Sequence, residues 1–461
     1  MNKNSVNMLS GSIFKGLLKM FIPIMIMNVI TQLTNVIDMS VLGILANDNA
    51  VGAVGTCGSL ITVVTGLIIC VPSGTNVVIA KHIGAGDQEK VDRALGTSMF
   101  FAVVAGVVLA IFGIVLAKPL LLSINCPDVL LKEAIIYFRL YFLGVPFLLL
   151  YNFSSAALRS VGDTKRPMYY MSACGILKIL LTLFFVGVLK LTVDGVAIAT
   201  IVSWLISGGL CLRILIKGHD KLKLKLKHFR FYFKELGNIL YIGIPLGLQS
   251  VMYSFANVAI TAEVNLLGPE ATKGMSISGQ YDGIMYQVAM APSFAVLAYV
   301  SQNIAAKNYK RANRSVGCAV LLALGFGAIL GGIMGLLSYP LTSIMSQDPL
   351  VIKYSQQKMN LISPLYFIHG IAEVLGAALR GMEKPIVPTI TSFVFMCAIR
   401  FPWVWFVYPL FKNLTFLFAI WPIGWVLNSS VLLVVYLVTF KKVKKKIIEK
   451  INQEEVAPSH S

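Results

Sequence analysis

Long apolar blocks separated by short polar connections run through the whole chain. The blocks lack a two-residue alternation, and each approaches the length of about 20 apolar residues that a helix needs to cross a bilayer. Backbone groups in lipid must be hydrogen-bonded internally, so helices are expected and a membrane barrel is not. The pattern predicts an all-α membrane protein with twelve transmembrane helices, at residues 14–44, 52–81, 96–117, 133–158, 168–189, 195–216, 239–267, 275–305, 315–338, 352–379, 386–409 and 415–440.

The composition supports this prediction. Of the 461 residues, 57% are apolar and only 13% are charged, and the mean hydropathy is +0.79. Soluble globular proteins contain about 25% charged residues. These proportions exclude an ordinary soluble domain.

The chain contains an internal duplication. The segment Ala156-Ala157-Leu158-Arg159-Ser160 returns in the second half as Ala377-Ala378-Leu379-Arg380-Gly381. The two segments are 221 residues apart, and the same offset relates Gly96 to Gly317 and Pro167 to Pro388. Nearer the start of the copies the offset is 222, as between Pro23 and Pro245 and between Asn35 and Asn257. A unit of six helices is therefore present twice, as in transporters whose site between two equivalent halves can face either side of a membrane.

Prolines recur inside the first two spans of each half. Proline removes a backbone donor and bends a helix, so it can create a hinge. The hinge candidates are Pro23, Pro72, Pro245 and Pro292. The alternative is that prolines are simply common in membrane helices.

The net charge of +19 is distributed unevenly. If both termini are cytoplasmic, the cytoplasmic connections and termini hold 29 Lys and Arg, and the opposite connections hold six. This asymmetry sorts membrane topology, so it predicts cytoplasmic termini and argues against nucleic-acid binding. Basic segments beside a membrane also suit anionic lipid headgroups.

The duplication and the charge pattern predict four regions. These are an N-lobe at 1–216, a basic cytoplasmic linker at 217–238, a C-lobe at 239–440 and a basic cytoplasmic tail at 441–461. Lysine and leucine alternate from Lys221 to Lys227. We expect this segment to lie at the headgroups, with its lysines toward phosphate and its leucines toward lipid. The tail after Phe440 is expected to be frayed.

Neither a metal site nor an enzyme is indicated. The seven cysteines form no CxxC pair, and six of them lie in predicted spans, where cysteine acts as a small apolar residue. The sequence contains no Ser-His-Asp, HExxH or Cys-His constellation and no GxxxxGKS phosphate loop. We therefore expect no cofactor other than a coupling ion, H⁺ or Na⁺.

Several short motifs occur in a fixed order along both halves. They are Ile83-Gly84-Ala85-Gly86-Asp87, Ala157-Leu158-Arg159, Gly162-Asp163-Thr164-Lys165, Gly195-Val196-Ala197-Ile198-Ala199-Thr200, Gly243-Ile244-Pro245, Gln302-Asn303-Ile304-Ala305-Ala306-Lys307-Asn308, Ala378-Leu379-Arg380-Gly381 and Arg400-Phe401-Pro402. Together with the two sets of six spans, this order resembles the MATE family of multidrug and toxic compound extrusion transporters, and most of all its DinF-like bacterial branch. The resemblance runs from about residue 14 to 440 and implies export of amphipathic, often cationic compounds driven by proton or sodium flow.

The N-lobe candidates centre on Asp38, which matches the acidic position of the first helix in the family. Ionisable residues inside spans are costly and mark functional sites by default. The resemblance implies an Asn and an Asp on the fifth span, but this chain has Lys178 and Thr182 there. We hypothesise that Lys178 forms an ion pair with Asp38; the alternative is that it reaches toward the membrane interface. The remaining candidates for coupling or substrate binding are Gln32, Asn35 and Thr200.

The C-lobe candidates are three acids and one base. Glu263, Asp282 and Glu373 lie in predicted spans, and Arg400 occupies the position that the duplication makes equivalent to Lys178. An acidic surplus around Arg400 is expected to suit cationic substrates or protons. Asn257 and His369 complete the set, and His369 with Glu373 could form a proton relay, a metal-ligand pair or an ordinary hydrogen bond.

The predicted function is secondary active efflux. An antiporter would export amphipathic, cationic drugs or metabolites by alternating access of the two lobes. The alternatives are a flippase for a lipid-linked saccharide, an intramembrane enzyme, and a channel or scaffold; twelve spans with buried acids favour the exporter. We expect a monomer in a bacterial inner membrane, with a small-molecule partner and no nucleic acid.

Overall fold

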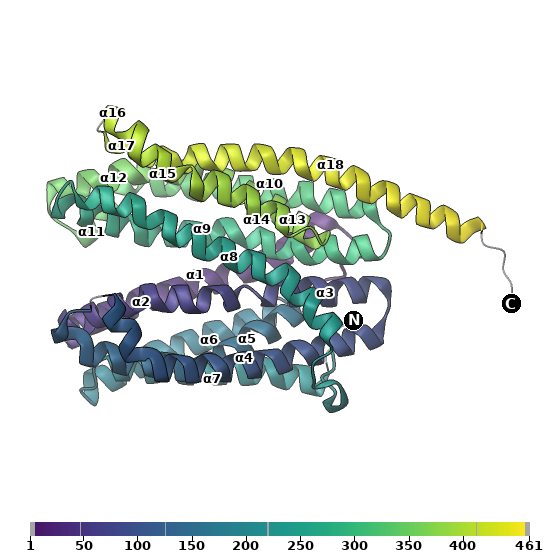
Figure 1. The fold of residues 1–461 in the computed structure, drawn as a ribbon, viewed down its shortest axis with the longest axis horizontal. Coiled ribbons are helices and arrows are strands. Elements are labelled where there is room, and N and C mark those ends of the chain that lie inside the picture. Colours follow the sequence, from purple (N-terminus) through teal and green to yellow (C-terminus); the bar gives the residue numbers. More distant parts are fainter. Residues whose placement is uncertain (1–4, 47, 125, 219–220, 412, 457–461) are drawn as a thin grey trace. The chain divides into compact units, whose positions relative to one another are not determined.

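The computed structural model describes residues 5–46, 48–124, 126–218, 221–411 and 413–456, and this part of the chain is helical without a β-strand (Figure 1). The α-helices are α1 (Ile13–Leu45), α2 (Asp48–Ile69), α3 (Pro72–Ala85), α4 (Gln88–Ser123), α5 (Asp128–Ser160), α6 (Lys165–Thr182), α7 (Val193–Lys217), α8 (Phe233–Asn265), α9 (Pro269–Ala305), α10 (Tyr309–Leu336), α11 (Ser338–Met345), α12 (Pro349–Ile362), α13 (Tyr366–Gly381), α14 (Ile386–Ser392), α15 (Arg400–Pro402), α16 (Tyr408–Phe411), α17 (Leu414–Phe418) and α18 (Ile420–Val456). Wider π-helical turns occupy Leu183–Val188, Phe393–Ala398 and Trp403–Val407, and 3₁₀ turns occupy Leu226–His228 and Ser363–Leu365.

Twelve helical stretches of the described chain are long and apolar enough to cross a membrane. They coincide with the twelve predicted blocks, with ends that differ by several residues. The prediction of an all-α, twelve-span membrane protein is therefore confirmed. Some spans combine two or more helices, because α2 and α3 form one stretch from Leu60 to Ala85, and α12 and α13 form another from Pro349 to Gly381.

The chain folds into two compact units. Among the described residues, the first contains 5–6, Met20–Ile79 and Asp87–Val251. The second contains Asn7–Lys19, Ala80–Gly86 and the chain from Met252 to Val456. Helix α8 thus contributes residues to both units. The lobe limits drawn from the sequence stay a prediction.

The duplication extends to the backbone of the connections. Asp87 and Asn308, at equivalent positions of the two copies, each cap a helix by accepting a hydrogen bond from the N–H three residues on, at 3.1 and 3.2 Å. The residue before each cap has a positive φ, 76° at Gly86 and 60° at Lys307. A second equivalent pair with positive φ is Gly162 and Glu383. The two copies therefore share left-handed turns even where the second has lost its glycine.

The hinge candidates differ in local structure. Pro23, Pro245 and Pro292 lie inside the continuous helices α1, α8 and α9. Pro72 instead begins α3, after α2 has ended at Ile69. A proline at a helix start sacrifices no hydrogen bond, so this span is broken where its counterpart is continuous. The role of all four prolines as hinges stays a prediction.

The basic linker packs on α4 within the first unit. Lys225 forms an ion pair with the buried Asp92, and Gln88 donates to the carbonyl of Lys221 at 2.7 Å. Leu222 is fully buried. The expectation that the leucines face lipid is therefore wrong for Leu222, because apolar protein surface satisfies a leucine as well as lipid does. Leu226 is 88% exposed, so other parts of the protein cover little of its side chain.

Gly96 sets how closely the linker approaches α4. A Cβ at this position would lie 2.0 Å from the carbonyl oxygen of His228, whereas one at its repeat partner Gly317 would meet nothing within 4 Å. We expect Gly96→Ala to displace the linker at a cost of about 1–3 kcal/mol. Trypsin should then cleave after Lys225 or Lys227 faster than in the unchanged protein. Gly317→Ala is the matched control; equal cleavage of the two variants would contradict the packing argument.

The tail continues as a helix. Helix α18 runs through the predicted tail to Val456 and extends past the other helices of its unit in Figure 1, so the expectation of a frayed tail is wrong as far as Val456. The Tyr436 hydroxyl donates to Asn313 at 2.8 Å, and the Lys444 ammonium lies 5.5 Å from the Tyr309 ring centroid. These contacts fix α18 against the start of α10. Residues 457–461 lie outside the described chain.

Candidate functional site

The first unit encloses a cavity of about 490 Å³. Three aromatic side chains, Tyr137, Tyr141 and Trp204, form part of its wall. The polar groups in the wall come mainly from α1, α6 and α7, with one from α2, and they are Thr31, Thr34, Asn35, Asp38, Thr62, Lys178, Thr200 and Ser203. A largely apolar cavity with a few convergent polar groups is the usual form of a small-molecule site.

Asp38 and Lys178 form an ion pair in this cavity. The Lys178 Nζ lies 2.5 Å from Asp38 Oδ2, and both residues are more than nine-tenths buried. The Thr182 hydroxyl donates to Asp38 Oδ1 at 3.3 Å. Thr182 ends α6, and π-helical turns begin at the next residue; such turns are frequent at functional sites. The hypothesised pair is thus present, and its part in coupling stays a prediction.

Two of the other three N-lobe candidates line the cavity and the third does not. Asn35 and Thr200 line the cavity with Asp38, and the Thr200 hydroxyl donates to Val196 O of its own helix at 2.8 Å. Gln32 is half-buried and is not part of the cavity wall. A spacing of six residues turns a helix by more than one and a half turns, which explains why Gln32 and Asp38 face different sides.

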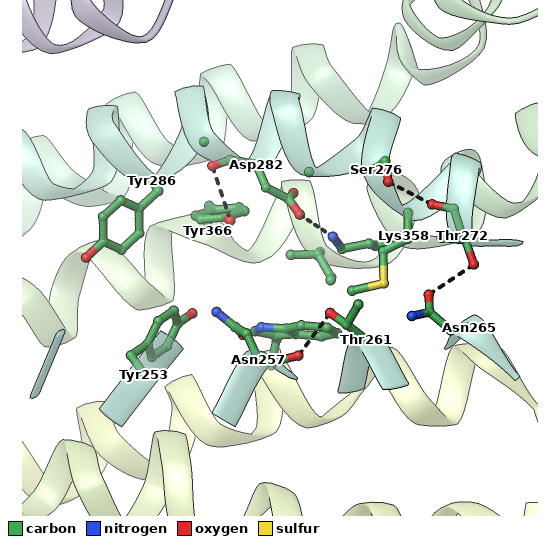
Figure 2. Close-up of a pocket in the computed structure, with 15 residues that line it drawn as sticks. Tyr253, Asn257, Thr261, Asn265, Thr272, Ser276, Asp282, Tyr286, Lys358 and Tyr366 are labelled. Carbon is green, nitrogen blue, oxygen red and sulfur yellow. Dashed lines mark hydrogen bonds and ion pairs between the residues drawn. The ribbon is translucent and has the colours of Figure 1, made fainter. Parts of the chain in front are cut away.

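The second unit encloses a cavity of about 410 Å³ between α8, α9, α12 and the start of α18 (Figure 2). Figure 2 shows Asp282 and Lys358 pointing toward one another, while Tyr253 and Asn257 project from α8 on the facing side. Lys358 Nζ lies 2.7 Å from Asp282 Oδ2. Tyr366 donates to the backbone carbonyl of Asp282 at 3.4 Å.

Arg400 lies behind this cavity wall. Its side chain is 1% exposed, and its Nη1 donates to Asn257 Oδ1 at 2.5 Å. The guanidinium carbon lies 4.6 Å from the Tyr253 ring centroid and 5.4 Å from that of Trp421. Both distances allow cation–π attraction. Asn257 and Arg400 are therefore brought together, as two of the predicted C-lobe residues.

Both copies of the duplication match one family model. The MatE family model covers residues 23–184 in the first copy and 245–406 in the second. The chain belongs to the MatE family. Membership agrees with the MATE resemblance drawn from the motifs and makes the protein a multi-pass membrane transporter.

Relatives and solved structures extend along nearly the whole MATE chain. "Probable multidrug resistance protein YoeA" of Bacillus subtilis is 25% identical over 401 residues, covering 85% of this chain and 86% of the relative. A protein of Shewanella oneidensis named "FAD transporter" is 24% identical over 391 residues, covering 83% and 86%. A crystal structure of a MATE protein in complex with MaL6 superposes with a TM-score of 0.90 at 19% identity, covering 96% of this chain and 100% of that one. This last likeness shows the shared fold.

The expected acidic surplus around Arg400 is wrong for this MATE protein. Asp282 pairs with Lys358, and Glu373 lies 3.6 Å from Arg380 Nη2. Each acid thus already has a basic partner. Glu263 is half-buried and is not part of the cavity wall. The sequence-based charge argument for a cationic substrate therefore fails in this unit.

His369 is packed among aromatic rings. Its ring lies 5.4 Å from that of Tyr286 and 5.5 Å from that of Trp425. Within the described chain, neither ring nitrogen has a hydrogen-bond partner, so the expected ordinary hydrogen bond is absent. No group of three or more His, Cys, Asp or Glu in the described residues is arranged to hold a metal. The proposed coupling roles of His369 and Glu373 stay predictions.

Four residues of the second-unit site, Lys358, Arg380, Tyr253 and Trp421, are not among the residues predicted from the sequence. Lys358 is 4% exposed although it lies only six residues from the start of its predicted span at 352–379. Arg380 follows Glu373 by seven residues, two helical turns, and this spacing could have revealed the pair. Tyr253 and Trp421 carry no such signal, because aromatic residues are common throughout the spans.

Proposed function

We propose that this MATE protein is a secondary active efflux transporter in which protonation of Asp38 drives the exchange of an amphipathic compound. The observation that carries the proposal is the buried ion pair between Asp38 and Lys178, which lies in the wall of a cavity large enough for a small molecule. Only a group whose interactions differ between two conformations can shift their populations. A pair that forms and breaks is such a group.

The pair favours a proton over sodium. The Lys178 ammonium already lies 2.5 Å from the Asp38 carboxylate, so a sodium ion would have to displace a covalently held cation of the same charge. A proton instead neutralises the carboxylate and ends its attraction for Lys178. The released ammonium is costly in a buried position, and rehydration of the cavity relieves that cost.

The proposed cycle needs an amphipathic substrate. Tyr137, Tyr141 and Trp204 in the cavity wall suit an apolar or aromatic body. The relatives named for multidrug resistance and for FAD transport support a compound that joins a ring system to polar groups. The flippase alternative is less well supported, because the matched family and the twelve candidate spans both fit the exporter. The protein acts as a monomer in a bacterial inner membrane with cytoplasmic termini.

Transport by the purified chain in proteoliposomes tests the function. A fluorescent amphipathic dye is loaded, and either a pH gradient or a sodium gradient is imposed. We expect flux under the pH gradient at a rate that is the same with and without sodium. Flux that requires sodium would contradict proton coupling, and flux under neither gradient would contradict the efflux function.

A further inference from the structure

Arg400 is a buried cation without a carboxylate partner among the described residues. It lies in the described chain beside Asn257, Tyr253 and Trp421, and no carboxylate of that chain is within ion-pair distance of it. A charge inside a membrane protein is normally paired or functional. An amide oxygen and two aromatic faces stabilise a guanidinium only in part, since none of them carries a formal negative charge.

The duplication shows which acid is missing. Arg400 is the repeat counterpart of Lys178, and Asn257 is that of Asn35 at the same offset. The counterpart of Asp38 at this offset is Ile260, which is fully buried. Ile260 belongs to the same buried hydrophobic cluster as Met396 and Trp421, and the Trp421 ring lies against the Arg400 guanidinium. The second unit thus has a base at the position equivalent to Lys178 and no acid at the position equivalent to Asp38.

The cavity beside Arg400 consequently has an excess of positive charge. Asn257, Tyr253 and Trp421, which contact Arg400, are also part of the wall of the cavity in Figure 2. Lys358 and Asp282 in the wall pair with one another, so Arg400, which lies behind the wall, leaves one positive charge without a carboxylate partner among the described residues. Glu373 is engaged by Arg380 and is not part of the wall.

We propose that the second-unit cavity binds the acidic group of an amphipathic anion. A carboxylate or phosphate of the ligand supplies the negative charge that is absent at the position of Ile260. The aromatic or apolar body of the ligand lies among the rings of the cavity wall, which are Tyr253, Tyr286, Tyr366 and Trp421. This inference rests on the proposed efflux function and names a substrate class for it. It also predicts that Asn257 positions the guanidinium through the 2.5 Å hydrogen bond to Nη1.

Binding of three probes with one ring system tests the inference. The probes are 1-naphthylacetate, 1-naphthyl phosphate and 1-naphthylmethylammonium, titrated calorimetrically into the full-length protein in detergent, with protein-free micelles as the blank. At least one anion should bind about 10-fold or more tightly than the ammonium, and comparison of the two anions distinguishes a carboxylate from a phosphate ligand. Equal binding of all three probes, or tighter binding of the ammonium, would overturn the proposal.

Substitutions locate the site. Arg400→Gln removes the unpaired charge and should weaken anion binding about 10- to 100-fold, in line with the strength of charge-assisted hydrogen bonds. Ile260→Asp rebuilds the acid of the first unit and should weaken it similarly, while keeping Arg400. This second variant serves where Arg400→Gln does not fold. Lys353→Gln is the matched control, because it removes an exposed charge on the helix that carries Lys358.

The outcomes separate this inference from the efflux function. Calorimetric binding uses no ion gradient, so a preserved anion preference without pH-driven flux would contradict only the function. Flux with wild-type anion binding in both Arg400→Gln and Ile260→Asp would overturn only the inference.

Discussion

Replacing Asp38 by Asn is expected to lower pH-driven flux by at least about 100-fold. The amide cannot exchange a proton, and it leaves the buried Lys178 without a counter-charge. Breaking a buried ion pair in this way costs about 3–5 kcal/mol. Since every 1.4 kcal/mol is a factor of ten, a cost confined to one conformation shifts the conformational equilibrium by more than about 100-fold. The measurement is the initial rate of dye flux in proteoliposomes under a fixed pH gradient.

A conservative change elsewhere controls for this effect. Asp128→Asn makes the same chemical change at an exposed position in the first turn of α5 and should leave the flux unchanged. The amount of folded Asp38→Asn is determined by size-exclusion chromatography before reconstitution. Wild-type flux in folded Asp38→Asn would show that the coupling group lies elsewhere.

Replacing Lys358 by Met is expected to destabilise the protein by about 3 kcal/mol. Asp282 would keep its charge without the ammonium that lies 2.7 Å away, and its Oδ1 already has no hydrogen-bond partner in the described chain. The apolar side chain of Met retains the packing of the lysine stem. Thermal unfolding is followed with a thiol-reactive fluorophore, which reports exposure of the buried Cys57, Cys174, Cys211 and Cys397.

The double substitution distinguishes lost pairing from lost packing. Asp282→Asn together with Lys358→Met removes both charges and should restore most of the melting temperature, because no unpaired ion remains. The exposed Lys353→Gln should melt like the unchanged protein. A double variant as unstable as Lys358→Met would mean that packing, and not the ion pair, is what Lys358 supplies.

The sequence predicted the membrane fold because the hydropathy of the spans and the offset of the internal repeat are each read from many residues. Twelve blocks of about 20 apolar residues have few alternatives in a bilayer. The prediction that the linker leucines face lipid was wrong for Leu222, because alternating leucines can pack equally well on lipid or on an apolar protein surface. Leu222 faces protein, and the ion pair that holds the segment joins Lys225 to Asp92, far apart along the chain. Such a long-range contact has no local signature.

The candidate site was predicted unevenly. The pair of Asp38 and Lys178 could be hypothesised because Lys178 departs from the family pattern on a helix that resemblance placed near Asp38. In the second unit the acids were recognised, but their partners were not. Position in a span does not fix which way a side chain points, so the sequence did not single out Lys358 or Arg380 as partners of these acids. For the same reason, two acids that were expected to surround Arg400 pair with other bases, Asp282 with Lys358 and Glu373 with Arg380.

The central claim is that Asp38 and Lys178 act as one coupling unit. A double-mutant cycle on pH-driven flux with Asp38→Asn, Lys178→Gln and the combined variant tests it most directly. Each single variant leaves one buried group unpaired, whereas the combined variant leaves none. We expect the combined variant to lose less flux than the product of the two single losses, by at least about tenfold. Losses that multiply without any such difference would contradict the claim that the two residues work as a pair.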